Sequence, residues 1–330
     1  MSVVQTLNGA IDSSEMGYTL SHEHIFVHDE GLVSNFPSVW NEEFVIQKSR
    51  EKIIQAYEAG VRTILDASVL GNGRNVAFLK KAMQGLPMNI IVCTGTFYKT
   101  ELPGFFMSQD IDVMTKLFVK DITEGIGDTG VKAAVVKACT DYPGVTFGVE
   151  KALRAAARAH LETGAVLHTH AHAPTQQGLA QQKIFKEEGV DLSKVYIGHA
   201  INSDDMDYLH GLLDQGSFIG FDRWAAGPLP PVKGMPEHPP VTREKEVNVL
   251  EKLLREGYED QILIGNDACC WQTVVRFETE ENSPELYTNS YLIFVNEVSK
   301  MLLEAGVTER QLHKMTVDNP RRLFECNAQC

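Results

Sequence analysis

The stretch "YTLSHEHIFV", residues 18–27, is the first of a series of apolar runs that decides the fold. Similar runs rich in β-branched residues recur at 62–68, 89–95, 133–140, 165–171, 195–200, 217–223 and 262–268. Amphipathic segments of helical period lie between the runs, for example at 41–60, 148–164 and 243–258, and a last one at 290–306 follows the eighth run. This alternation predicts parallel pairing in an α/β fold, and eight units predict a closed (β/α)8 TIM barrel.

An open, doubly wound sheet is the main alternative fold. Such a sheet more usually carries about five or six strands and, where it binds nucleotides, a glycine fingerprint after the first strand. The segment "GNGRN", residues 71–75, does not match that fingerprint. The closed barrel therefore remains the prediction.

Residues 1–330 are expected to form a single barrel domain, because the chain shows no linker, low-complexity tract or repeat beyond the strand–helix alternation. Two segments interrupt the regular pattern. Residues 225–243 hold six of the 13 prolines, and residues 268–288 form an irregular stretch after the eighth run. Both follow predicted barrel strands, so we expect both loops to lie near an active site.

The composition excludes several classes of protein. A hydrophobic content of 43% with 22% charged residues is ordinary for a globular protein, and no segment is long and apolar enough to span a bilayer. The formal net charge of −14 argues against nucleic acid or an anionic membrane as a partner. The N-terminus lacks the pattern of a secretory signal, and six cysteines without C-x-x-C spacing suit free thiols. A cytoplasmic location is the expectation.

The C-terminal ends of the predicted strands carry side chains that can bind metals. A barrel of this type places its functional residues at those ends, and His22 and His24 share a face because side chains at i and i+2 point the same way. Taken singly, each such residue has a plain structural explanation, such as a lysine that reaches out of the core or an aspartate that caps a helix. Together they predict a metal site, since buried polar groups are costly unless paired or coordinated. The candidates are His22, His24, Lys137, His170, His199 and Asp267.

Ordered motifs along the whole chain point to a known family. They include "TLSHEHIFV", "TILDASVLGNGR", "VVKACTDYPGVT", "GAVLHTHAHA", "GVDLSKVYIGHA", "GSFIGFDRW", "ILIGNDACC" and "GVTERQLHKMTVDNPRRLF". This pattern resembles the amidohydrolase superfamily and, within it, the phosphotriesterase and phosphotriesterase-like lactonase family. The resemblance implies a hydrolase with two divalent metal ions, and it suggests a homodimer.

The resemblance also implies a role for each candidate ligand. His22, His24 and Asp267 would bind the more buried ion, His170 and His199 the more exposed ion, and carbamylated Lys137 (N6-carboxylysine) would bridge the two. An ammonium group would be repelled by two dications, whereas a carbamate is an anionic bidentate ligand. Zinc is the first choice, although the ligand set also suits cobalt, manganese or iron.

Three other histidines are less readily assigned. His168 and His172 alternate with His170, and only the family pattern selects His170 as the ligand. We expect His168 and His172 to lie in the pocket or behind the ligands. His28 lies past the end of the first run, and we expect it at the surface.

The expected reaction is the opening of a lactone by a hydroxide that bridges the metal ions, with Asp267 moving a proton to the leaving alkoxide. Arg223 matches an arginine of the lactonase branch, whereas Phe97 stands where that branch usually has tyrosine, with Tyr98 beside it. We expect Arg223 to take part in catalysis with Asp267. We also expect Phe97, Tyr98, Arg223 and Trp224 to contact a small-molecule substrate, such as an N-acyl-homoserine lactone or a related lactone with an apolar tail.

Other functions remain open at this stage. An organophosphate phosphotriesterase or another carboxylic ester hydrolase could use the same metal centre, and weak phosphotriesterase activity is expected as a side reaction. A mononuclear deaminase of the superfamily would share the histidines and the aspartate but would have no use for Lys137. A barrel that only binds a ligand is the remaining alternative, because a fold alone does not establish activity.

Overall fold

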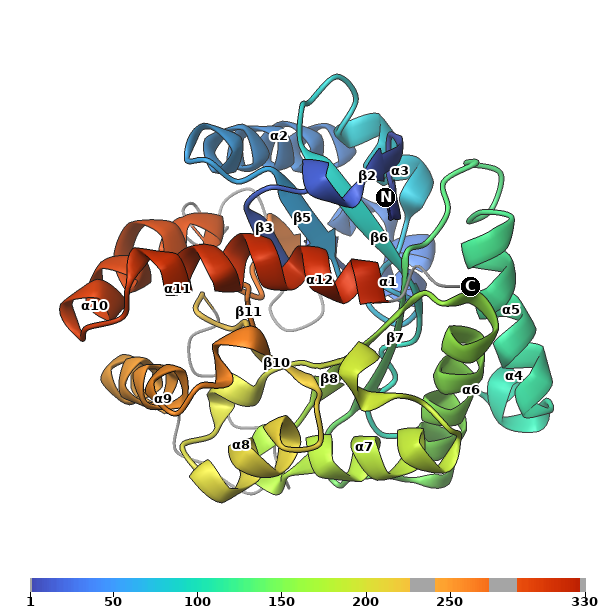
Figure 1. The fold of residues 1–330 in the computed structure, drawn as a ribbon. Helices are drawn as coiled ribbons and strands as arrows, with labels where there is room; N and C mark the ends of the chain where they lie inside the picture. Colours follow the sequence, from blue (N-terminus) through green and yellow to red (C-terminus); the bar gives the residue numbers. More distant parts are fainter. Residues whose placement is uncertain (1, 226–240, 273–289, 327–330) are drawn as a thin grey trace.

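Eight parallel strands form the centre of the molecule, with helices around them (Figure 1). The computed structural model describes residues 2–225, 241–272 and 290–326. The strands are β3 (Thr19–Glu23), β5 (Thr63–Asp66), β6 (Asn89–Gly95), β7 (Val135–Thr140), β8 (Val166–Ala171), β9 (Val195–Ile197), β10 (Phe218–Phe221) and β11 (Ile262–Ile264). Each lies within one of the eight predicted runs, which confirms the (β/α)8 TIM barrel.

The strands pair in chain order from β3 to β11, and the barrel closes between these two outer strands. Asp267 N donates to His22 O at 3.0 Å, and His24 N donates to Ala268 O at 2.8 Å. Gly265 permits this close approach, because a Cβ there would lie 2.8 Å from His22 O. The first and last predicted strands thus meet at their C-terminal ends.

Helices surround the barrel, and α12 (Asn319–Cys326) crosses one end of it (Figure 1). They are α1 (Glu30–Asn35), α2 (Glu42–Glu58), α3 (Val76–Ala82), α4 (Gly104–Ser108), α5 (Ile111–Thr123), α6 (Phe147–Thr163), α7 (Gln177–Glu187), α8 (Met206–Leu213), α9 (Arg243–Arg255), α10 (Ser299–Glu304), α11 (Glu309–His313) and α12 (Asn319–Cys326). Side-chain caps define where several of them begin. Asn41, for example, accepts from Phe44 N at the start of α2, and Thr146 accepts from Val149 N at the start of α6.

The predicted helix at 290–306 is less regular than its sequence pattern. It contains a 3₁₀ turn at Ser290–Leu292 and a π-helical turn at Phe294–Val298 before α10 begins. Phe294 N donates to the side-chain oxygen of Asn266 at 3.2 Å. The Asn266 side chain therefore binds a backbone N–H at the point where the helix departs from regular α-helical geometry.

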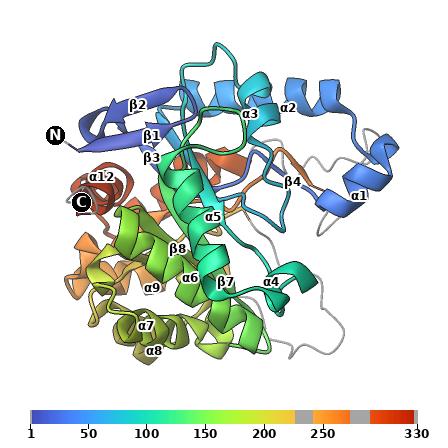
Figure 2. The ribbon, with the colours of Figure 1, turned by 90° about the vertical axis from the view of Figure 1, so that its right-hand side faces the viewer.

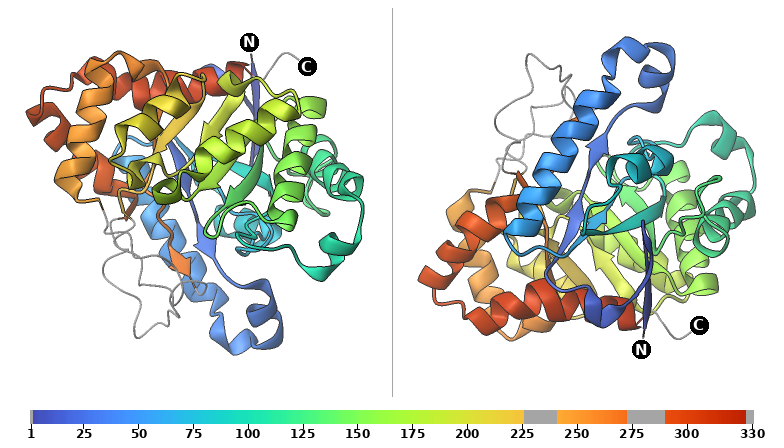
Figure 3. Two further views of the ribbon diagram at one scale, coloured as in Figure 1. Left: turned by 90° about the horizontal axis from the view of Figure 1, so that it is seen from below. Right: turned by 90° about the horizontal axis from the view of Figure 1, so that it is seen from above.

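An N-terminal hairpin that the sequence did not predict covers one end of the barrel. Strands β1 (Val3–Thr6) and β2 (Gly9–Asp12) pair antiparallel, and Leu7 N donates to Ile90 O at 2.8 Å. Ser13 Oγ donates to Glu325 of α12 at 2.9 Å, so both chain ends lie at this end of the molecule (Figure 2). Helix α1 lies at the opposite end (Figure 3).

Apolar side chains from the strands fill the barrel interior, as expected for this fold. The cluster includes Leu65, Ile91, Val135, Val166, Tyr196, Phe218 and Leu263, with Val4, Met16, Leu323 and Phe324 from the hairpin end. Because apolar residues close that end, the polar side chains at the C-terminal ends of the strands gather at the other.

The two predicted loops are described only in part. Residues 226–240 and 273–288 lie outside the described residues, and Arg243, placed at the end of the first loop, begins α9. Within the second loop, β12 (Trp271–Gln272) pairs in parallel with β4 (Phe26–Val27). Among the described helices, none combines the length and apolar character needed to cross a membrane.

Candidate metal centre

The structure brings the six predicted ligands together at the C-terminal end of the barrel. Lys137 Nζ lies 3.2 Å from His22 Nε2, and Asp267 Oδ1 lies 3.8 Å from His22 Nε2 and 3.5 Å from His24 Nε2. The His199 ring centroid is 4.6 Å from those of both His22 and His170. Ligand atoms of His22, His199 and Asp267 all lie within 4.8 Å of one another, a spacing that can hold a metal ion.

Unusual backbone conformations direct two of these side chains. His199 and Asp267 have positive φ angles of 64° and 51°, a left-handed conformation that residues other than glycine rarely adopt. Beside Lys137, strand β6 comes so close that a Cβ on Gly95 would lie 1.9 Å from Lys137 O. The backbone is therefore shaped locally around the predicted ligands.

Asp222 holds two of the imidazoles, and the sequence did not identify this residue. Its fully buried carboxylate accepts hydrogen bonds from His22 Nδ1 at 3.2 Å and from His199 Nδ1 at 3.0 Å. Tyr196 donates its hydroxyl to the same carboxylate at 2.6 Å. A carboxylate bound to Nδ1 leaves Nε2 free to bind a metal, as is common for metal-ligating histidines.

The other two imidazoles have their own partners. His170 Nε2 lies 3.0 Å from Asp141 Oδ2, which also forms an ion pair with Lys99 at 3.2 Å. His24 Nδ1 lies 2.8 Å from Ser68 Oγ. In each predicted histidine ligand, a carboxylate or a hydroxyl thus holds one ring nitrogen. The second nitrogens of His22 and His24 face two other predicted ligands, Lys137 and Asp267.

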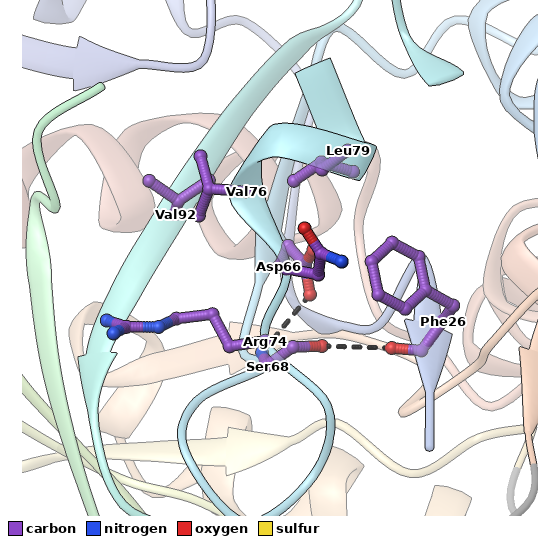
Figure 4. Close-up of a pocket in the computed structure, with 8 residues that line it drawn as sticks. Phe26, Asp66, Ser68, Arg74, Val76, Leu79 and Val92 are labelled. Atoms are coloured by element: carbon purple, nitrogen blue, oxygen red, sulfur yellow. Dashed lines mark hydrogen bonds between the residues drawn. The ribbon is translucent and has the colours of Figure 1, made fainter. Parts of the chain in front are cut away.

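Ser68, the partner of His24, lines a small cavity at the end of β5 (Figure 4). Its lining includes Asp66 and Ser68, and Asp66 accepts a hydrogen bond from Ser68 N at 3.1 Å. Ser68 Oγ in turn lies 3.3 Å from Phe26 O. The partner of His24 is therefore itself fixed by the backbone of β4 and by a buried carboxylate.

Burial keeps the imidazoles in the form that binds metals. It lowers the pKa of His22 to about 3 and the pKa values of His170 and His199 to about 4, so the rings are neutral at pH 7. Burial also lowers the pKa of Lys137. Burial alone would raise the pKa of Asp267. The neighbouring His199 and other groups outweigh this effect and hold the pKa of Asp267 well below its usual range.

Arg223 and Phe97 lie beside the ligands. Arg223 Nε forms an ion pair with Asp267 Oδ2 at 3.0 Å. The Phe97 ring meets the edge of the His170 ring at a centroid distance of 5.3 Å, and Lys137 Nζ is 5.3 Å from the Phe97 centroid. Arg223 and Phe97, which were both predicted to contact the substrate, therefore lie next to the candidate metal centre.

Tyr98 and Trp224 have their described contacts elsewhere. The Tyr98 ring lies 3.1 Å from the point where Gly71 would carry a Cβ. Trp224 is only 1% exposed and packs near Phe221 and Phe294. Substrate contact by either residue stays a prediction.

The remaining histidines lie in different environments. His168 is buried in the barrel interior, 4.6 Å from the His22 centroid, in agreement with a place behind the ligands. His172 Nδ1 lies 2.8 Å from Thr175 Oγ1. The expectation of a surface position for His28 is wrong, because this ring is 6% exposed and stacks on Phe26 in an aromatic cluster.

Four imidazoles, a carboxylate and a buried lysine at the C-terminal end of a (β/α)8 barrel define a metal-dependent hydrolase. Comparisons with known proteins agree. The model of the Phosphotriesterase family matches residues 2–324, and the chain belongs to that family.

Relatives match over nearly the whole chain. A "Phosphotriesterase homology protein" of Mycobacterium tuberculosis is 38% identical over 98% of both chains, and an "Aryldialkylphosphatase" of Saccharolobus solfataricus is 35% identical over 96% of this chain and 97% of its own. The solved structure of the phosphotriesterase from Mycobacterium tuberculosis superposes with a TM-score of 0.89 at 38% identity, over 98% of each chain. The similarity to these relatives thus extends over the whole barrel.

Proposed function

We propose that the chain binds two divalent metal ions and hydrolyses lactones. His22, His24 and Asp267 would hold the more buried ion and His170 and His199 the other. Lys137, carbamylated on Nζ, would be shared by both ions. Ligand atoms of His22, His199 and Asp267 lie within 4.8 Å of one another, which supports a metal site here. The division of the ligands between two ions rests on the family resemblance.

The surroundings of Lys137 fit this modification. The side chain is fully buried, and its Nζ contacts His22 Nε2 and Ala67 O. Among the described residues, no carboxylate lies within salt-bridge distance of it, so an ammonium ion here would be buried without a direct ion-pair partner. A lowered pKa favours the neutral amine, which is the form that reacts with CO₂.

When bound, the metal ions supply Lewis acidity and a water ionised at neutral pH, for which zinc is the first choice. The protein's own groups do the rest. Asp267 is positioned to accept a proton and pass it to the leaving alkoxide, while its ion pair with Arg223 fixes its orientation. The Phe97 ring packs against the edge of the His170 ring and would limit the access of water there.

The position of Arg223 is the observation that favours a lactone. Its Nε lies 3.0 Å from Asp267 Oδ2, and its side chain is only 13% exposed. A cation there can bind the carbonyl side of a lactone ring. The second candidate is an organophosphate, because one relative is named an aryldialkylphosphatase. A phosphotriester with a good leaving group needs less help from such a cation.

The test compares kcat/KM for an N-acyl-homoserine lactone and for an activated phosphotriester, in the wild type and in Arg223→Ala. We expect the lactone to be the better substrate and to lose more in the variant. Arg243→Ala is the matched control, because Arg243 lies over the Trp224 ring at 5.1 Å and holds the same region without touching Asp267. Loss of phosphotriester hydrolysis alone in Arg223→Ala would reverse our order of the two functions.

The family resemblance also supports a single-domain chain that forms a homodimer. Light scattering on the purified protein measures the oligomeric state directly. A monomer at micromolar concentration would contradict the dimer without affecting the proposed chemistry.

A further inference from the structure

Glu23, between His22 and His24, has a role that metal binding does not explain. Side chains alternate along a strand, so Glu23 leaves β3 on the face opposite the two imidazoles. Its carboxylate is fully buried and reaches the segment that follows β11, more than 240 residues away in the chain. A buried carboxylate is costly unless its oxygens are hydrogen-bonded.

Backbone donors on both sides of Asp267 bind this carboxylate. Glu23 Oε1 accepts from Asn266 N at 2.6 Å and from Asn266 Nδ2 at 3.1 Å, and Oε2 accepts from Ala268 N at 2.9 Å. The amide between them, Asp267 N, donates to His22 O. Three consecutive N–H groups are thus bound by two consecutive residues of β3.

The clamped segment has a demanding geometry. Asp267 has a φ of 51°, in the left-handed region that is unfavourable for residues with a Cβ. Its neighbours are fixed from a second side, because the Asn266 side chain donates to Tyr291 O at 3.3 Å. A backbone in this conformation persists only where its surroundings determine it fully.

We propose that Glu23 is a positioning residue that clamps residues 266–268 and so aims the Asp267 carboxylate at the metal centre. This inference rests on the proposed metal centre. It explains why the residue between the two histidine ligands is itself a carboxylate, since an acceptor with two oxygens is needed to bind both amides.

Glu23→Gln tests the clamp, because the amide keeps the shape but replaces one acceptor oxygen by a donor that faces a backbone N–H. Cobalt-loaded protein is challenged with a chelator, and the visible absorption of bound Co²⁺ is followed. We expect retention of Co²⁺ to weaken by roughly 10–100-fold, the range typical of groups that orient metal ligands. We also expect kcat to fall while KM changes little.

Glu30→Gln is the matched control. Glu30 Oε1 also accepts two backbone N–H groups, those of Gly71 at 2.8 Å and Gly73 at 3.1 Å, in the loop that follows β5. The glutamine keeps one oxygen that can accept both N–H groups, so we expect this variant to retain Co²⁺ as the wild type does. If Glu23→Gln behaves like Glu30→Gln, Glu23 is only structural and the proposal fails.

Glu23→Asp covers the case in which Glu23→Gln does not fold. The shorter side chain keeps its charge but cannot reach both amides, so we expect an intermediate loss of Co²⁺. Wild-type retention in Glu23→Asp would overturn the clamp. A wild-type protein that binds no Co²⁺ would instead overturn the proposed metal centre itself.

Discussion

The two sides of the candidate metal centre are built differently. On the β3–β11 side, the main chains of two strands hold the ligands, through Asp267 N to His22 O and His24 N to Ala268 O. On the β8 side, a side chain holds the ligand: the Asp141 carboxylate binds His170. Asp141 in turn pairs with Lys99, whose side chain is 36% exposed. The first side is part of the barrel's closure, whereas the second extends toward solvent.

This difference has a physical consequence. Changes on the β3–β11 side disturb both the closure of the barrel and the metal site, so stability and metal affinity should fall together. Changes at Asp141 remove one partner of one imidazole and should affect metal affinity alone. Two buried residues join the sides: Lys137, next to His22, and Asp222, which binds both His22 and His199.

Lys137→Ala should have the largest effect. Removal of the ligand proposed to be shared by both ions should abolish nearly all activity, well beyond the roughly 10–100-fold typical when only a supporting group is lost. Elemental analysis should show the loss of one of two ions per chain. One ion per chain in the wild type, unchanged in the variant, would rule out the dinuclear centre.

A second buried lysine provides the control for that experiment. Lys52 of α2 is 4% exposed and is not among the predicted ligands. Lys52→Met should reduce thermal stability and leave the metal content at the wild-type value. An equal metal loss in both variants would show that the effect of Lys137→Ala is general unfolding.

Asp267→Asn comes next in size. The amide keeps an oxygen for the metal but is a poor proton acceptor, so kcat should fall by about 10²–10⁴-fold, the usual contribution of a general acid–base group. Metal content should fall much less. A fully metallated variant with near-normal kcat would remove the proton-transfer role from Asp267.

The barrel could be predicted because its signals are local. The six candidate ligands could be predicted from local signals together with the family resemblance, which alone selects His170 over His168 and His172. Each strand lies in a short apolar run, and each candidate ligand lies near the end of its run. The pattern failed where the structure depends on distant partners. His28 looked like a surface residue after a strand, but Phe26 and Trp40 enclose its ring.

Asp222 shows why the supporting groups were missed. Its local sequence "FIGFDRW" gives no sign that its carboxylate meets His22, 200 positions earlier in the chain. Glu23 was equally hidden, because in "SHEH" the two histidines attract attention and the partner amides lie after β11. The N-terminal hairpin packs against the barrel end and has no counterpart in the strand–helix pattern.

Asp222→Asn and Asp141→Asn test the comparison of the two sides directly. Each should weaken metal binding by roughly 10–100-fold. Asp222 holds one imidazole of each proposed site, so Asp222→Asn should weaken the binding of both ions. Asp141→Asn should weaken the binding of one ion only. Chelator titration with two resolved steps measures this, and identical losses from both variants would contradict the distinction between the sides.

The smallest expected effect concerns the aromatic pair that follows β6. The Phe97 ring lies against His170, whereas the Tyr98 ring packs against Gly71, and burial raises the pKa of Tyr98. Tyr98→Phe should therefore change lactone kcat/KM by no more than about 0.5 kcal/mol, the size typical of substitutions away from a site. Phe97→Tyr, by contrast, places a hydroxyl beside the centre and should alter lactone turnover by about 1 kcal/mol, close to one hydrogen bond. A loss of about 1 kcal/mol in Tyr98→Phe, seen for lactones and not for a phosphotriester, would show instead that Tyr98 supplies the hydroxyl that Phe97 lacks.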